Sequence, residues 1–143
     1  GINHNGNFKL IEEMIRLSFL GGADFAKFQL YDSQKLFGDS SRKKFEFSFN
    51  QVKELKNICD YYGIEFLASV FDEEKLEWCE ALKVSRYKIA SRTLKNDHKL
   101  CNEILNKNKE TYASLGFWNN ESLPFNNINI TSPLVNKYCQ GTN

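Results

Sequence analysis

The hydrophobic pattern of the chain divides it into segments with two different periods. Apolar residues recur at intervals of three and four in four stretches, which is typical of amphipathic helices. We therefore expect helices over residues 8–20, 51–62, 73–82 with Asp72 as the N-cap, and 97–106. Between them, short and mostly apolar runs predict strands over residues 25–31, 64–71, 86–91 and 111–115.

Strands and helices that alternate along a chain indicate a parallel sheet with right-handed crossovers. The predicted fold class is therefore α/β, either an open doubly wound sheet or part of a (β/α)8 barrel. With one more strand that ends at Gly1, the pattern predicts about five strands with four helices between them. Residues 32–49 are expected to form a polar loop, and residues 126–143 a weak strand followed by a tail of uncertain structure.

Composition and charge exclude several classes of protein. With 41% hydrophobic and 26% charged residues, the chain has the balance of a globular domain. Its net charge is +1 and its basic run, Arg42–Lys44, is short, so we expect no nucleic-acid partner. No stretch approaches the ~20 apolar residues of a membrane span, so we expect no membrane segment. The 4 cysteines form no Cys-x-x-Cys pair, which indicates reduced thiols and a cytoplasmic location.

Two lysines lie inside strands that otherwise look buried. Lys27 leaves its strand on the same face as Gln29, and Lys88 repeats the arrangement in a later strand. Ligands of parallel α/β folds bind at the carboxyl ends of the strands. A pair of desolvated ammonium groups needs anions, so these lysines predict a substrate with phosphate and carboxylate groups. The alternative is that each lysine reaches solvent or pairs with a local acid such as Asp24 or Glu65.

Hydroxyl and amide groups accompany the lysines. Ser69, Ser91 and Ser114 are expected at the ends of three different strands, where they have hydrogen bonds to offer an anion. Asn5 has the amide group that binds sugar hydroxyls, and His4 has a ring that orients them or transfers a proton. An ordinary turn before the first helix is the alternative for this segment. With 2 histidines in the sequence, we expect no metal site built from this chain alone.

Four motifs in this order resemble one enzyme family. They are Gly-Ile-Asn-His-Asn-Gly at 1–6, Gly-Ala-Asp-Phe-Ala-Lys-Phe-Gln at 22–29, Phe-Leu-Ala-Ser-Val-Phe-Asp at 66–72 and Tyr-Lys-Ile-Ala-Ser at 87–91. Together they are similar to the N-acetylneuraminate (sialic acid) synthase family, which includes legionaminic and pseudaminic acid synthases. The resemblance covers residues 1–116 and implies a partial (β/α)8 TIM barrel. Residues 1–125 would then be the N-terminal part of the synthase domain, without the family's C-terminal antifreeze-like domain.

The resemblance also implies a reaction and the residues that carry it. Phosphoenolpyruvate is expected to condense with the open-chain aldehyde of an N-acetylmannosamine-like amino sugar, giving a nonulosonic acid and phosphate. Lys27 and Lys88 match the family's catalytic lysines, which hold phosphoenolpyruvate. Further matches to substrate-binding positions are Ser69, Ser91 and Ser114 on the phosphoenolpyruvate side, and Asn5 and Gln29 on the amino-sugar side.

Other features implied by the resemblance lie outside this chain. A divalent metal, Mn2+ or a substitute, is expected for the parent enzyme, with histidine ligands from later strands, and so is a homodimer. A (β/α)8 barrel needs about 250 residues, so we expect the isolated chain to aggregate or self-assemble and to be inactive. Two departures, Thr93 in place of an acidic residue and Leu115 in place of a threonine, affect the sugar side most.

Two other functions fit the same pattern. One is a different enzyme on the same barrel, such as another sugar-phosphate synthase or an aldolase. An aldolase forms a Schiff base on a lysine, which borohydride traps. The second is a non-catalytic or degenerate fragment that only binds anionic sugars.

Overall fold

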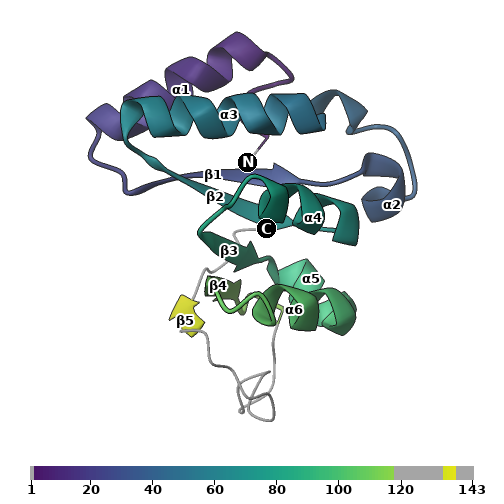
Figure 1. The fold of residues 1–143 in the computed structure, drawn as a ribbon. Helices are drawn as coiled ribbons and strands as arrows, with labels where there is room; N and C mark the ends of the chain where they lie inside the picture. The colour runs from purple at the N-terminus through teal and green to yellow at the C-terminus, as the bar shows by residue number, and fades with distance from the viewer. Residues whose placement is uncertain (1, 118–133, 138–143) are drawn as a thin grey trace. The chain divides into compact units, whose positions relative to one another are not determined.

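The computed structural model describes residues 2–117 and the backbone of residues 134–137. The chain divides into two compact units, Gly1–Val84 and Ser85–Asn143. Each unit has its own strands and helices (Figure 1).

The first unit contains two strands with helices before, between and after them. In chain order its elements are α1 (Phe8–Leu20), β1 (Phe25–Leu30), α2 (Ser33–Phe37), the 3-10 turn η1 (Lys43–Phe45), α3 (Phe49–Tyr62), β2 (Glu65–Val70) and α4 (Glu73–Ala81).

Side-chain caps fix where these helices begin. The Asn7 side chain accepts a hydrogen bond from the Leu10 N–H, and the Asp72 side chain accepts one from the Lys75 N–H. These residues are the N-caps, so α1 starts directly after Asn7 and α4 directly after Asp72. Ser48 and Gln51 form a capping box, which starts α3 at Phe49, two residues before the predicted position. Gly63 ends α3 with φ 76°, a backbone angle that favours glycine. The predicted helices over 8–20, 51–62 and 73–82 are thus confirmed with small shifts of their ends.

The two strands of this unit are parallel; the two faces of β1 differ in burial, whereas β2 is buried on both faces from Phe66 to Val70. Ala26 pairs with Phe66 and Phe28 pairs with Ala68, and all four side chains are buried. Figure 1 shows α1 and α3 side by side along these strands, where they cover that face. The opposite face carries the polar side chains, as the alternation in the sequence predicts.

The second unit begins with a strand and continues through two short helices. Its elements are β3 (Arg86–Ile89), α5 (Ser91–Asn96), α6 (His98–Leu105), β4 (Glu110–Ser114) and β5 (Leu134–Lys137). β3 is parallel to β4, and β4 is parallel to β5. Residues Tyr87, Ile89, Leu94, Cys101 and Ile104 form its core. Asp97 caps α6, so the predicted helix over 97–106 and the strand over 111–115 are confirmed within one residue at each end.

Two predictions of local structure need correction, and a third is not tested. The expected polar loop over 32–49 contains α2 and η1, because Asp32 caps a helical turn that has too few apolar residues to show a period. The predicted strand over 86–91 ends at Ile89, and Ser91 is the first residue of α5. Residues 2–6 form coil and a turn, while the strand expected to end at Gly1 lies outside the described residues.

Two further findings concern the end of the chain and membranes. The weak strand expected from residue 126 falls mostly outside the described residues, and a strand is found at Leu134–Lys137. Among the residues that the structure describes, none of the helices has the length and apolar character needed to cross a membrane.

Candidate functional site

The polar face of the first unit brings three predicted site residues onto two neighbouring strands. Gln29 lies directly opposite Ser69 in the register of β1 and β2, and Lys27 lies opposite Leu67. Paired positions of parallel strands point to the same side of the sheet, so Lys27, Gln29 and Ser69 share one face. The two longer side chains are half-buried, and Ser69 is fully buried. The predicted common face of Lys27 and Gln29 is therefore confirmed.

The hydroxyl of Ser69 is buried and has no hydrogen-bond partner among the described residues. The side chain is 1% exposed, and its Oγ makes no hydrogen bond with any residue in the described part of the chain. A buried hydroxyl without a partner costs about 1–3 kcal/mol, and most native structures avoid that cost. The hydroxyl therefore has its full donor and acceptor capacity left for a ligand.

Tyr31 is a second buried hydroxyl that sequence reasoning missed. It follows β1 at the next position on the face of Lys27 and Gln29, and its ring makes edge contacts with Phe37 and Phe71. Its hydroxyl is buried and lacks a hydrogen-bond partner among the described residues. Burial raises the pKa of Tyr31, so the phenol keeps its proton at neutral pH. The spacing of two between Gln29 and Tyr31 places both on one strand face, and this was a signal in the sequence that could have identified Tyr31.

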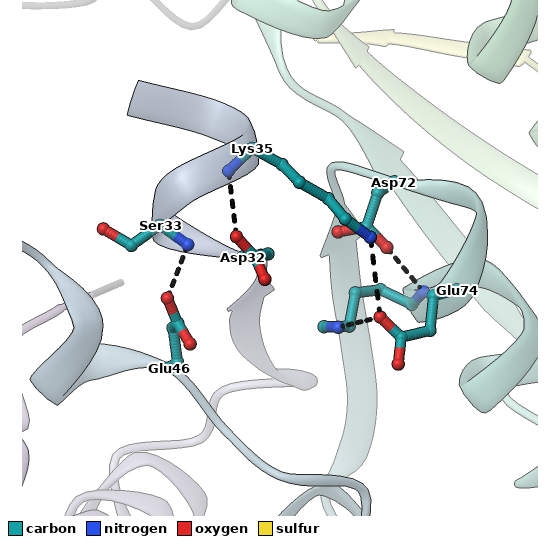
Figure 2. A network of polar contacts seen from close by, with 7 residues as sticks. Asp32, Ser33, Lys35, Glu46, Asp72 and Glu74 are labelled. Carbon is teal, nitrogen blue, oxygen red and sulfur yellow. Dashed lines mark hydrogen bonds and ion pairs between the residues drawn. The ribbon is translucent and has the colours of Figure 1, made fainter. Parts of the chain in front are cut away.

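Charged residues connect the segments that follow β1 and β2 (Figure 2). Lys75 Nζ lies 2.8 Å from a carboxylate oxygen of Glu74, and Lys35 Nζ lies 3.8 Å from the same oxygen. The backbone N–H of Lys35 donates to Asp32 and holds the pKa of that carboxyl below its usual value. The hydrogen bond from Lys75 lowers the pKa of Glu74 in the same way. The pair between Lys35 and Glu74 joins α2 to α4 beyond the carboxyl ends of the two strands.

Ser33 organises the loop that follows α2, and no sequence signal pointed to it. Its N–H donates to the Glu46 carboxylate, as Figure 2 shows, and its side chain is 1% exposed. The Ser33 hydroxyl donates to the Asp39 carbonyl oxygen at 2.8 Å and accepts from the Arg42 N–H at 3.2 Å. Unlike Ser69, this serine has its hydrogen bonds satisfied inside the protein.

The N-terminal turn holds His4 inside and Asn5 outside. His4 is 4% exposed, and its Nδ1 accepts a hydrogen bond from the Gly6 N–H, so the neutral ring carries its proton on Nε2. Burial lowers the pKa of His4, which favours this neutral form at pH 7. Asn5 is exposed and has φ 50°. His4 also lines a hollow beside β1 whose wall includes Lys27.

The second unit repeats the combination of a lysine and an unpartnered serine. Lys88 lies opposite Tyr112 in the register of β3 and β4, and Ser114 lies two residues beyond Tyr112 on the same face. Ser114 is 5% exposed, and its Oγ has no hydrogen-bond partner within the described residues. Within the same ranges, the half-buried Lys88 side chain forms no ion pair. Ser91, in contrast, is half-buried at the start of α5 and does not lie on a strand.

An ion pair lies at the other end of the same strands. Arg86 is the first residue of β3 and Glu110 the first of β4, and their side chains meet at 2.6 Å. The Tyr112 hydroxyl donates to Glu110 at 2.7 Å, and this bond raises the pKa of Tyr112. Glu110 therefore pairs with Arg86 at the amino ends of β3 and β4.

Three cysteines lie in helices of the described residues. Cys59, Cys79 and Cys101 are buried in these helices, as expected for small apolar residues. Burial raises the pKa of Cys59 and of Cys101 to about 12, so neither is a nucleophile at neutral pH. In residues 2–117, no group of three or more His, Cys, Asp and Glu side chains is arranged to hold a metal ion.

Comparisons with known proteins identify the family to which the chain belongs. The NeuB family model matches residues 14–126. The N,N'-diacetyllegionaminic acid synthase of Legionella pneumophila is 28% identical over 116 residues, which cover 67% of this chain and 32% of that protein. The N-acetylneuraminate-9-phosphate synthase of Homo sapiens is 32% identical over 114 residues, with the same coverage of 67% and 32%.

A solved structure extends the comparison to the fold. The crystal structure of the N-acetylneuraminic acid (sialic acid) synthetase from Leptospira borgpetersenii, in complex with citrate, superposes with a TM-score of 0.83 at 27% identity. The match covers 94% of this chain and 50% of that one. The predicted fold, part of a (β/α)8 barrel, is therefore confirmed. The chain spans about a third of the length of the curated relatives it matches, since both coverages are 32%.

Proposed function

The chain belongs to the NeuB family, and from this premise we propose that the protein carrying it condenses phosphoenolpyruvate with an amino-sugar aldehyde. In this reaction C3 of phosphoenolpyruvate forms a bond to the aldehyde carbon of an N-acetylmannosamine-like sugar. Water adds to C2, the C2–oxygen bond to the phosphate breaks, and inorganic phosphate leaves. The product is a nonulosonic acid, the class to which the acids named in the relatives' names belong.

The observation that carries the proposal is the pair of buried serine hydroxyls that have no hydrogen-bond partner among the described residues. Ser69 in the first unit and Ser114 in the second are 1% and 5% exposed, and each shares a strand face with a lysine. A buried hydroxyl without a partner among the described residues, on the same strand face as a lysine, is suited to an anion, because the anion accepts hydrogen bonds from both groups. Phosphoenolpyruvate supplies such acceptors at its phosphate and its carboxylate.

Each residue then has a stated role. Lys27 and Lys88 neutralise phosphoenolpyruvate, while Ser69, Ser91 and Ser114 orient it through their hydroxyls. Asn5 and Gln29 bind the amino sugar through their amide groups. Charge that develops on the phosphate and the carboxylate during the reaction is stabilised by donors already in place, which is the largest contribution in many enzymes. Holding both substrates in one orientation adds the effect of proximity.

The metal expected for the family has no ligand set among the described residues. In that part of the chain, no three or more His, Cys, Asp or Glu side chains are arranged to hold a metal ion. Lys27 and Lys88 are accordingly given only the work of binding and charge stabilisation.

The proposal is tested by product formation with the complete protein that carries this sequence. The protein, with Mn2+ added, is incubated with phosphoenolpyruvate and N-acetylmannosamine, and in parallel with N-acetylmannosamine 6-phosphate. Mass spectrometry of the products and 31P NMR of released phosphate are the readouts. We expect a nonulosonic acid and phosphate in equal amounts with one of the two sugars.

Two results would contradict the proposal. One is release of phosphate without any dependence on the sugar. The other is covalent trapping of Lys27 or Lys88 by borohydride in the presence of a carbonyl substrate, because that result indicates Schiff-base chemistry instead.

A further inference from the structure

We propose that Ser33 and Glu46 position Asn5 and thereby set the affinity for the amino sugar without affecting the affinity for phosphoenolpyruvate. This inference rests on the proposed function, in which Asn5 faces the sugar. It concerns a chain of contacts inside the first unit, from the segment after β1 to the N-terminal turn.

The first link is the loop between α2 and α3, which wraps around Ser33. Ser33 binds the loop at three points, through the Asp39 carbonyl, the Arg42 N–H and the Glu46 carboxylate. Because Ser33 lies three residues beyond the end of β1, the strand itself anchors the loop. The bond to Glu46 joins a neutral donor to a carboxylate, which makes it stronger than an ordinary backbone hydrogen bond.

The second link runs from Glu46 to His4 through the residues on either side of Glu46. The Phe47 ring lies over the His4 ring with centroids 5.0 Å apart, and the Phe45 ring meets it edge-on at 5.9 Å. Phe47 is 6% exposed and also contacts Phe28 of β1. Glu46 therefore fixes two aromatic residues that hold the buried imidazole between them.

The third link joins the same loop to the turn around Asn5. A Cβ on Gly6 would lie 2.7 Å from the Lys44 carbonyl oxygen, so the turn and the loop are in close backbone contact. The Gly6 N–H donates to His4, and the Asn7 N–H donates to the His4 carbonyl at 2.8 Å. Asn5 lies between His4 and Gly6 with φ 50°, in the left-handed region that asparagine adopts more readily than most residues. Movement of the loop at Glu46 would therefore move Asn5.

The backbone of the phosphoenolpyruvate side is held by a different set of contacts. Lys27 and Ser69 lie within β1 and β2, where the parallel ladder fixes their backbone. The structure thus predicts a separation: a loosened loop weakens the grip on the sugar and leaves the grip on the anion unchanged.

The test compares Glu46→Ala with Glu46→Gln in the complete protein. Glutamine keeps a side-chain oxygen that accepts the Ser33 N–H, whereas alanine removes the acceptor. We expect Glu46→Ala to raise KM for N-acetylmannosamine, or for its 6-phosphate if that is the substrate, by about tenfold, because small misplacements of a binding group cost that much or more. KM for phosphoenolpyruvate should change by less than about twofold, and Glu46→Gln should restore both values.

Hydrogen exchange provides a readout that is independent of turnover. In Glu46→Ala, amides of residues 2–7 should exchange faster than in the wild type, and in Glu46→Gln at the wild-type rate. Lys43→Ala, an exposed residue of the same loop, serves as the matched control and should change neither readout. Ser33→Ala keeps the backbone N–H that donates to Glu46 and removes the bonds to Asp39 and Arg42, so its effects should have the same direction as those of Glu46→Ala and be smaller.

Each outcome decides the matter. Equal changes of both KM values, or unchanged exchange over residues 2–7 in Glu46→Ala, would overturn the inference. If the wild type has no turnover with either sugar, the proposed function has failed. Faster exchange in Glu46→Ala would then still support the link from Glu46 to the turn.

Discussion

The polar faces of the two units place their ion pairs at opposite ends of the strands. In the first unit, Lys35, Glu74 and Lys75 pair beyond the carboxyl ends of β1 and β2 (Figure 2). In the second unit, Arg86 and Glu110 pair at the amino ends of β3 and β4. Despite this difference, each unit keeps one lysine and one unpartnered serine on the same face.

The difference separates scaffold from site. The ion pairs lie at the carboxyl ends of the strands in one unit and at the amino ends in the other. Their charged groups pair with each other, and they hold loops or strands together. The serine hydroxyls of Ser69 and Ser114 are the groups that both units leave without a partner in the described residues. Since burial without a partner costs free energy, this shared feature indicates a ligand.

The largest expected effect on activity comes from substituting Lys27 or Lys88, the lysine on the polar face of each unit. Lys27→Ala and Lys88→Ala should each lower kcat/KM of the complete protein by about 100- to 1000-fold, the cost of losing a charge-stabilising donor. Steady-state kinetics with phosphoenolpyruvate and the amino sugar measure it.

The exposed Lys99 of the second unit is the control, because its contact with Glu103 lies 3.7 Å apart on the surface. Lys99→Ala should leave kcat/KM within about twofold. If Lys27→Ala or Lys88→Ala changed kcat/KM as little as the control does, that lysine would not be part of the site.

The next effect contrasts two buried serines of the first unit. Ser33→Ala removes two hydrogen bonds of a satisfied hydroxyl and should lower the free energy of unfolding by about 1–2 kcal/mol. Ser69→Ala removes a hydroxyl that has no partner, so stability should stay equal or rise by up to about 1 kcal/mol. Urea unfolding without ligand measures both. Comparable destabilisation by the two substitutions would show that Ser69 has a protein partner.

A smaller effect is expected at the ion pair of the second unit. Glu110→Gln should cost about 0.5–1 kcal/mol of stability, because both partners are partly exposed. The pKa of Tyr112 should fall, since its hydrogen bond to the Glu110 carboxylate is what raises it. Chemical denaturation and ultraviolet titration of tyrosine measure the two quantities. A loss of phosphoenolpyruvate affinity in this variant would contradict the separation of scaffold from site.

The smallest effect concerns the pH dependence that His4 gives the first unit. Its pKa is lower in the folded protein than the usual 6.5, so the unfolded chain takes up a proton first as the pH falls. Stability from the neutral ring is therefore complete above about pH 6.5 and declines below it. His4→Phe should flatten the stability curve between pH 7 and pH 5.5 in thermal unfolding. An equally steep curve in that variant would assign the decline to other groups.

The fold was predictable wherever one pattern was strong enough to dominate. The apolar stripe of α1 and the alternation in β1 predicted both elements to within one residue at each end. The short helices α2 and α5 were missed, because their 5 and 6 residues are too few to establish a helical period. Ser91 was therefore placed on a strand end and not at the start of a helix.

The site was predictable from strand parity and not from loop contacts. Lys27, Gln29 and Lys88 were found because side chains two residues apart share a face. Ser33 and Glu46 were not found, because their hydrogen bond joins residues that are far apart in sequence and carry no local pattern. Tertiary contacts of this kind require coordinates.

The central claim, that the unpartnered serines bind an anionic substrate, is tested most directly by titration calorimetry with phosphoenolpyruvate. The complete protein is compared with Ser69→Ala, Ser114→Ala and, as a control, Ser40→Ala, a change at an exposed serine of the loop before η1. Loss of one charge-assisted hydrogen bond should weaken binding by about tenfold in each of the first two variants and leave the control unchanged. Wild-type affinity in both Ser69→Ala and Ser114→Ala would contradict the claim.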